Sequence, residues 1–221
     1  MTETAPVATA RPAGRAPWKI PAAVVVALLA LAGAGVWLLW PDAETAVAVP
    51  GRVCEKSLPG GNVKGLMPEH GDKFQEKSAY NFASVGHSQK AMQNWGLGQC
   101  LLVGGGTTVE VEYRLLQGSD YTRDDVKREA GKSGSTPLTL GDAVGYLEGP
   151  GAHLFVDCPV RAGGDELLEV SVGVGGSADT KDRATRVSAA GLAADTARHA
   201  AQDIRHCTGA ESLPGGAPGI G

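Results

Sequence analysis

The chain has 221 residues, of which 43% are hydrophobic, and its formal net charge at pH 7 is −4. This apolar content is enough to bury one core of ordinary size, so we expect one folded domain. The acidic balance argues against a nucleic-acid-binding protein, because such proteins neutralise phosphates with a surplus of lysine and arginine.

Residues 20–40, IPAAVVVALLALAGAGVWLLW, form an uncharged apolar run. As a helix they would reach roughly 31 Å, about the thickness of the hydrocarbon core of a bilayer. Arg11, Arg15 and Lys19 precede the run, and basic residues stay on the cytoplasmic side during insertion. We therefore expect residues 1–19 to be a disordered cytoplasmic arm and the run to be a transmembrane helix. The rest of the chain is then extracellular, on a single-pass protein of the cell membrane.

A signal peptide cleaved after Ala48 is the alternative, because Ala46-Val47-Ala48 has small residues at the spacing that signal peptidase requires. The apolar run is longer than that of a usual signal peptide, which favours an uncleaved anchor. Beyond it we expect a linker over residues 41–52 and a folded extracytoplasmic domain over residues 53–208. Residues 209–221 are rich in glycine and proline and are expected to be a disordered tail.

Two stretches of the domain share one pattern, in which a cysteine, an apolar run, a glycine pair and a second apolar run follow one another. CLLVGGGTTVEVEYR begins at Cys100 and CPVRAGGDELLEVSV at Cys158, and each reads as strand, turn, strand, turn and helix start. In the first copy, apolar and charged residues alternate from Val109 to Leu115, with Val111 and Tyr113 apolar and Glu110, Glu112 and Arg114 charged, which predicts a half-buried strand. The apolar alternation of the second copy is displaced from this by one residue, which turns a strand over and requires a bulge or an altered turn. We expect two ββα-like repeats, with an accidental likeness of two hairpins as the alternative.

A long helix is expected over residues 180–207. Its small apolar residues recur every three or four positions and so form one stripe: Val187, Ala190, Ala194, Ala197, Ala201 and Ile204. Because most of the stripe is alanine, this helix can pack closely across one face of a sheet. Gly191 within the helix suggests a close contact there. The expected fold class is α+β, with a mainly antiparallel sheet.

Four cysteines in an exported domain allow three disulfide pairings. Cys158 lies in the second repeat and Cys207 ends the long helix near its buried stripe, so a bond between them would fix the helix to the sheet. Cys54 then pairs with Cys100. A zinc site is the alternative, but the spacings contain no close Cys-x-x-Cys pair and exported thiols are oxidised. No metal or other cofactor is expected.

No catalytic constellation is recognised. Gly86-His87-Ser88-Gln89-Lys90 has lysine where a nucleophile elbow requires its second glycine. His199, Asp203 and His206 share one side of the long helix, which is compatible with metal binding. Regular helix geometry turns this side away from the buried stripe, so we expect it to face solvent.

The segment LFVDCPVRAGGDELLEVSV and the helix end TARHAAQDIRHC resemble uncharacterised exported proteins of high-GC actinobacteria, often streptomycetes. In those proteins a strand cysteine and a cysteine at the end of an alanine-rich C-terminal helix recur. The resemblance covers about residues 53–208, and it implies two cysteine pairs but no established activity. Many such proteins are lipoproteins, but small residues do not precede Cys54 as in a lipobox, which favours the transmembrane anchor.

These features predict a membrane-anchored, non-enzymatic binding or interaction module of the cell envelope. Its partner would be an envelope protein or a cell-wall ligand, with no role for nucleic acid. One alternative is an accessory subunit that joins a membrane complex through its transmembrane helix. A cell-wall hydrolase is the other alternative.

Overall fold

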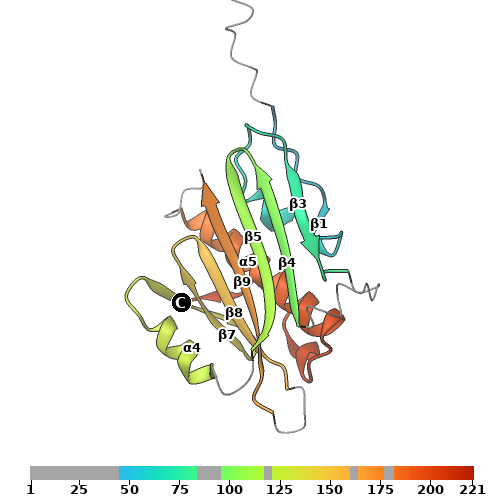
Figure 1. Ribbon diagram of the computed structural model, residues 1–221. Coiled ribbons are helices and arrows are strands. Elements are labelled where there is room, and N and C mark those ends of the chain that lie inside the picture. Colours follow the sequence, from blue (N-terminus) through green and yellow to red (C-terminus); the bar gives the residue numbers. More distant parts are fainter. Residues whose placement is uncertain (1–44, 84–95, 117–120, 160–163, 177–181) are drawn as a thin grey trace, which may run out of the picture. The chain divides into compact units, whose positions relative to one another are not determined.

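The computed structural model describes residues 45–83, 96–116, 121–159, 164–176 and 182–221. These ranges form an α+β fold with a large antiparallel sheet and a C-terminal helix, as the sequence predicted (Figure 1). Within these ranges, no helix has the length and apolar character needed to cross a membrane. The expected cytoplasmic arm and transmembrane helix fall in residues 1–40, outside the described part of the chain.

The main sheet has eight strands in the order β10-β6-β7-β8-β9-β5-β4-β3, and all neighbouring strands are antiparallel. Its strands are β3 (Gln75–Tyr80), β4 (Leu97–Gly104), β5 (Thr107–Leu116), β6 (Ser135–Leu140), β7 (Ala143–Glu148), β8 (Gly151–Asp157), β9 (Leu167–Gly176) and β10 (Gly219–Ile220). A separate two-stranded sheet pairs β1 (Arg52–Val53) with β2 (Leu58–Pro59). The helices are α2 (Gly61–Lys64), α4 (Arg123–Ala130), α5 (Arg183–Arg198), the π-helix η1 (His199–Ile204) and the 3-10 helix η2 (Ala210–Ser212).

The two expected repeats have the same order of elements but pack differently. Each is a hairpin followed by a helix, β4–β5–α4 and β8–β9–α5, and β5 pairs with β9 at the centre of the sheet. However, α5 packs on β8 and β9 over one face, whereas α4 packs on β6 and β7 over the other. The cysteines are not equivalent either, because Cys100 lies within β4 and Cys158 follows β8. The likeness therefore describes a shared order of elements and no repeated packing unit.

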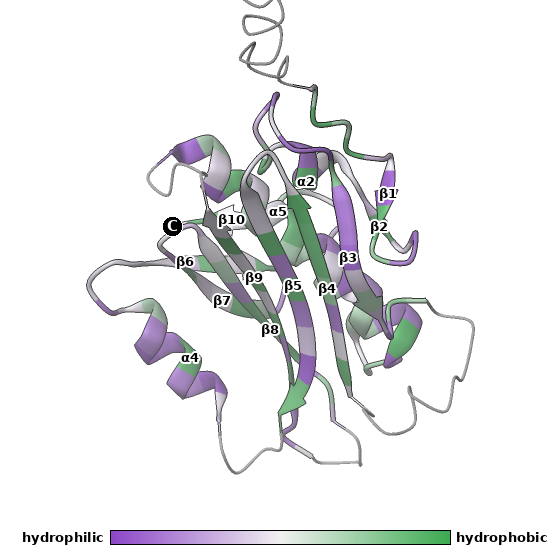
Figure 2. Cartoon of the chain, turned by 45° about the horizontal axis from the view of Figure 1, so that its top comes forward, coloured by the Kyte–Doolittle hydropathy of each residue, from purple (hydrophilic) through white to green (hydrophobic). Residues whose placement is uncertain are grey.

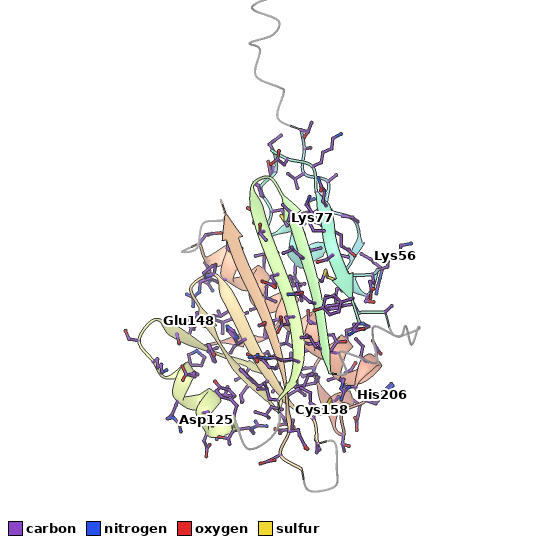
Figure 3. All side chains as sticks on the ribbon, viewed as in Figure 1. Lys56, Lys77, Asp125, Glu148, Cys158 and His206 are labelled. Carbon is purple, nitrogen blue, oxygen red and sulfur yellow. A yellow bond between two sulfur atoms is a disulfide. The ribbon has the colours of Figure 1, made fainter. Side chains whose placement is uncertain are left out.

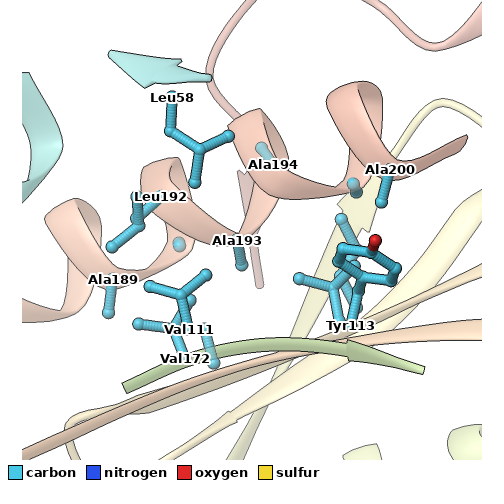
Figure 4. Close-up of a cluster of buried hydrophobic side chains, with 14 of the residues drawn as sticks. Leu58, Val111, Tyr113, Val172, Ala189, Leu192, Ala193, Ala194 and Ala200 are labelled. Atoms are coloured by element: carbon cyan, nitrogen blue, oxygen red, sulfur yellow. The ribbon is translucent and has the colours of Figure 1, made fainter. Parts of the chain in front are cut away.

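Helix α5 lies between the main sheet and the N-terminal segments. Ala189 and Ala193 point toward Val111 of β5, while Leu58 of β2 lies on the opposite side of the helix near Ala194 (Figure 4). All five of these side chains are at most 1% exposed. Small side chains on both sides allow a helix to lie this close to two layers at once.

The predicted stripe is buried along its middle, and its last residue, Ile204, is half-buried. Its four alanines are at most 1% exposed, but Val187 is 45% exposed. The N-terminal segments begin to cover the helix one residue later, where Gly65 lies against Ser188. The close contact expected at Gly191 is present, since an added Cβ would lie 2.6 Å from Oδ1 of Asn62. The sequence pattern indicated one buried side, whereas the structure buries the helix on two.

The folded domain begins earlier than predicted. Residues 41–52 were expected to be a linker, but the backbone N–H of Val47 donates to the carbonyl of Glu69 at 2.9 Å, and Ala46 forms an isolated bridge with His70. Val47 is also buried. Residues from 45 onward therefore belong to the domain, held mainly by backbone hydrogen bonds that an apolar pattern does not reveal.

The prediction of a disordered tail over residues 209–221 is wrong. Strand β10 pairs with β6, and Ala210 and Leu213 are buried. The guanidinium of Arg198 also donates to the carbonyl oxygens of Pro214 and Gly216. Backbone pairing and these charged hydrogen bonds order a segment whose apolar content alone is too low to pack.

The cysteines form the pairs that the sequence predicted. Cys54 is bonded to Cys100 and Cys158 to Cys207, with Cα–Cα distances of 5.5 and 4.6 Å. The first bond joins the β1–β2 segment to β4, and the second joins the end of η1 to the end of β8. Cys158 and His206 accordingly appear at one end of the domain in Figure 3. The first disulfide thus fixes the N-terminal layer to the sheet, and the second fixes the C-terminal end of the long helix to the sheet.

Candidate functional site on the open face of the sheet

One face of the main sheet has no described helix over β3, β4, β5 and β9. Helix α5 lies behind these strands in Figure 1, and α4 covers only the β6–β7 side of the near face. We call this area the open face. The residues that face outward on it include Tyr80, Gln99, Leu101, Val103, Thr108, Glu110, Glu112, Arg114, Glu169, Ser171, Gly173 and Gly175.

The alternation of β5 produces this face. Val109, Val111 and Tyr113 are buried toward α5, so the residues between them point the other way. Figure 2 shows the result as alternating hydrophobic and hydrophilic bands along β5. On the neighbouring strand, Leu101 and Val103 are only half-buried. The open face therefore combines a carboxylate-rich strand with an aliphatic one.

A row of hydrogen bonds crosses three strands of the open face. The hydroxyl of Tyr80 on β3 donates to Oε1 of Gln99 on β4 at 3.2 Å. The amide of Gln99 donates in turn to Oε1 of Glu110 on β5 at 2.5 Å. The pKa of the Tyr80 phenol is raised mainly by burial and also by the nearby carboxylates of Glu112 and Glu110. This hydroxyl therefore keeps its proton and remains a donor.

The most deeply placed acid of the face is Glu169 on β9, whose side chain is 10% exposed. Arg114 Nε donates to its Oε2 at 2.5 Å, and His153 Nδ1 lies 3.4 Å from its Oε1. Burial raises the pKa of Glu169, but His153 and Arg114 outweigh this effect and hold the pKa below its usual value. The His153 ring stacks on Tyr146, with centroids 4.9 Å apart. Glu169 is thus a fixed anion within the sheet surface.

Glu112 lies between Glu110 and Glu169, and its surroundings disfavour the charged form of its carboxylate. Within the described residues no hydrogen bond reaches its carboxylate, and its pKa is raised by burial and by Glu110 and Glu169, against the opposing effect of Arg114. The face therefore sets three carboxylates against one guanidinium that Glu169 already binds. Its excess charge is negative.

Two glycines leave part of the open face bare. Gly173 and Gly175 on β9 have no left-handed φ angle, and an added Cβ would meet only Glu110 Cβ at 4.0 Å for Gly173 and nothing within 4 Å for Gly175. By contrast, Gly176 has φ +86° and its added Cβ would lie 2.1 Å from the Gly106 carbonyl oxygen. The fold requires glycine at Gly176 but has room for larger residues at the other two positions.

The prediction that His199 faces solvent is wrong. Its side chain is 11% exposed, with Nδ1 2.8 Å from Asp203 Oδ2 and Nε2 2.6 Å from the carbonyl oxygen of Phe82. The side of the helix away from the stripe is also covered at this point, by the buried Phe82 that follows β3. Both ring nitrogens are engaged, and His206 contributes to neither contact. This histidine joins the helix to the end of β3 and has no nitrogen left for a metal.

A shallow concavity lies at the C-terminal end of the long helix. It has a volume of about 290 Å³ and lies beside the Cys158–Cys207 bond, lined by Gln202, His206 and residues 207–211. No group of three potential metal-ligating side chains occurs anywhere in the described part of the chain. The predicted nucleophile-like motif at residues 86–90 falls outside the described residues.

The predicted site residues and the open face are separate features. The four cysteines are nearly or completely buried and serve the packing of the domain. The alternation of Glu110, Glu112 and Arg114 was visible in the sequence. The approach of Glu169 and His153 was not, because it depends on how β8, β9 and β5 are paired.

No protein-family model matches the chain, and comparison with curated proteins and with solved structures gives no significant match.

Proposed function

We propose that this protein is a non-enzymatic, membrane-anchored module of the cell envelope that binds a protein partner through the open face of its sheet. The observation that carries the proposal is the open face itself, a flat surface with an ordered polar row and a bare glycine strip. The two disulfides support an exported location, because such bonds form and persist in oxidising compartments. The uncharged run at residues 20–40 supports the anchor.

The sheet edges are less suitable for binding than the face. Strand β3, at one edge, has a register shift between Glu76 and Ser78, and the extra residue Lys77 is exposed there (Figure 3). A bulge and a lysine both discourage the addition of another strand. At the other edge, β10 has only two residues. Binding by strand addition is therefore disfavoured.

A catalytic role has less support than binding. His153 and Glu169 resemble the base and orienting acid of a catalytic triad, and Ser171 is the cross-strand neighbour of His153. However, the described residues show no hydrogen bond between Ser171 and His153, and the concavity beside the Cys158–Cys207 bond does not include them, so nothing in the described part of the chain is seen to exclude water from these groups. Flat surfaces of this kind suit a macromolecular partner better than a small substrate.

Site-specific cross-linking in intact membranes tests the proposal. A photo-cross-linking amino acid at Thr108 or Ser171, both on the open face, should give a discrete adduct with a partner protein. The same amino acid at Glu211, which is exposed on η2, is the control and should give none. Adducts only from positions in residues 20–40 would instead support the accessory-subunit alternative, and no adduct from either open-face position would overturn the binding role of this face.

Carbonate extraction tests the anchor separately. The full-length protein should remain with membranes at alkaline pH and keep its original amino terminus. A soluble form that begins at Val49 would show that the apolar run is a cleaved signal peptide.

A further inference from the structure

We propose that the partner of the open face presents an extended, arginine- or lysine-bearing polypeptide segment that lies across β5 and β9. This inference rests on the proposed function, and it adds the chemistry of the partner. Three observations support it: the excess of carboxylates on β5, the bare backbone of β9 and the half-exposed aliphatic side chains of β4.

The charge of the face is complementary to a cation. Glu110 is exposed, and its Oε1 accepts one hydrogen bond from the neutral amide of Gln99. Glu112 receives no hydrogen bond within the described residues. Burial raises its pKa, Arg114 lowers it, and the neighbouring carboxylates of Glu110 and Glu169 raise it further. The single guanidinium nearby, that of Arg114, is bonded to Glu169. An incoming guanidinium or ammonium group would relieve this repulsion and form charge-assisted hydrogen bonds.

The glycine strip provides space for the backbone of such a segment. Gly173 is the cross-strand neighbour of Glu110, and Gly175 is that of Thr108. Valine or threonine at either position would suit a strand better, and the Cβ that they add would not be crowded by any described atom. Glycine inside a strand often marks a place where another backbone approaches closely. The bare strip lies directly beside a carboxylate, so one segment can use both.

The aliphatic part of the face favours a polypeptide over a polysaccharide or a lipid surface. Leu101 is the cross-strand neighbour of Glu110, and Val103 that of Thr108, and both are half-buried. These side chains suit contact with the aliphatic stems of lysine and arginine. The open face exposes one aromatic ring among its outward residues, that of Tyr80, so it offers little of the aromatic surface on which sugar rings stack. Its negative charge would be repelled by anionic lipids.

The test uses the full-length protein in neutral detergent and three fluorescent ten-residue peptides. These alternate valine with arginine, with serine or with glutamate, and their binding is measured by fluorescence anisotropy at 150 mM salt. We expect the arginine peptide to bind at least tenfold more tightly than the serine peptide, and the glutamate peptide not to bind. Equal affinity for the arginine and serine peptides, or no binding of the arginine peptide, would overturn the inference.

Two pairs of double variants separate charge from surface shape. Glu110→Gln with Glu112→Gln should weaken binding of the arginine peptide at least tenfold. Glu69→Gln with Glu211→Gln makes the same charge change at exposed positions outside the open face and should leave affinity within twofold. Equal losses from both pairs would mean that the peptide senses net charge only, and the inference would fail.

The glycine pair tests the bare strip with all charges intact. Gly173→Val with Gly175→Val should also weaken binding at least tenfold. Gly215→Val with Gly216→Val adds the same side chains at open positions of the C-terminal segment and should leave affinity unchanged. Unaltered binding by the Gly173/Gly175 variant would refute contact with the strip.

These outcomes are distinguishable from failure of the proposed function. Cross-links from Thr108 to a partner whose adduct maps to a neutral or acidic segment would keep the binding role and overturn the cationic one. Loss of all cross-links from the open face would overturn both.

Discussion

Ala194→Glu tests the arrangement in which α5 is covered on two sides. Ala194 is 1% exposed and lies near Leu58 of β2, in the layer between the helix and the N-terminal segments. A glutamate there must either bury its charge, bind a proton or separate β2 from the helix. Each outcome costs several kcal/mol, and we take about 4 kcal/mol as the expected loss of unfolding free energy. For a domain of this size the melting temperature should fall by about 8–16 °C.

Val187→Glu is the matched control. Val187 lies seven residues before Ala194 on the same stripe, but it is 45% exposed. Its substitution should therefore change the free energy of unfolding by no more than about 0.5 kcal/mol. Thermal unfolding followed by circular dichroism, with the disulfides intact, compares both variants with the parent protein. If Ala194→Glu melts within 2 °C of the parent, about the shift from 0.5 kcal/mol, this side of α5 is not buried and the three-layer arrangement is incorrect.

Four further changes test individual contacts. Replacing Cys158 and Cys207 together by serine opens a loop of 49 residues and should cost about 2–4 kcal/mol in chemical denaturation; non-reducing peptide mapping of the parent should find the two disulfides described above. Glu169→Gln should cost about 1–3 kcal/mol at pH 7. The difference from the parent should shrink as the pH falls from about 4.5, the ordinary value, toward the lowered folded pKa, because over this range the unfolded chain binds a proton that the folded carboxylate does not. Glu112→Gln should raise the melting temperature at pH 7, and this gain should shrink as the pH falls through the raised folded pKa and vanish below about 4.5, where the parent is protonated in both folded and unfolded states. Gly175→Val should raise the melting temperature by about 1–4 °C, because valine suits an unhindered strand position better than glycine; a lower melting temperature would mean that the site is not open.

The elements that the sequence predicted best are those with strong local periodicity. The alternation of Val109, Val111 and Tyr113 predicted a half-buried strand, and the alanine pattern predicted the C-terminal helix. The disulfide pairs were deducible because the ends of these two elements restrict which cysteines can meet. In each case the information lies within one element or in a short connection between two.

The features that sequence analysis missed depend on geometry between elements. The opposite packing of α4 and α5 is set by which face of the sheet has apolar residues left to cover, and Tyr146 and Phe155 provide them for α4. The burial of His199 depends on the segment after β3, which covers the helix on the side away from the predicted stripe. The C-terminal strand consists of Gly219 and Ile220, which have almost no strand signal of their own and are ordered by the existing edge of β6.

In the proposed binding mode, stability and binding make opposite demands on Gly173 and Gly175. A strand at the centre of a sheet gains from β-branched side chains, and β9 has valine at the alternate positions Val170, Val172 and Val174, two of which are fully buried. On the outward side of the same strand, the two glycines give up that gain although neither conformation nor crowding requires them. Local departures from the best residue for the fold are expected where a surface serves another purpose. A Gly175→Val protein that is more stable but binds the arginine peptide less well would therefore connect the glycine strip to function in a single variant.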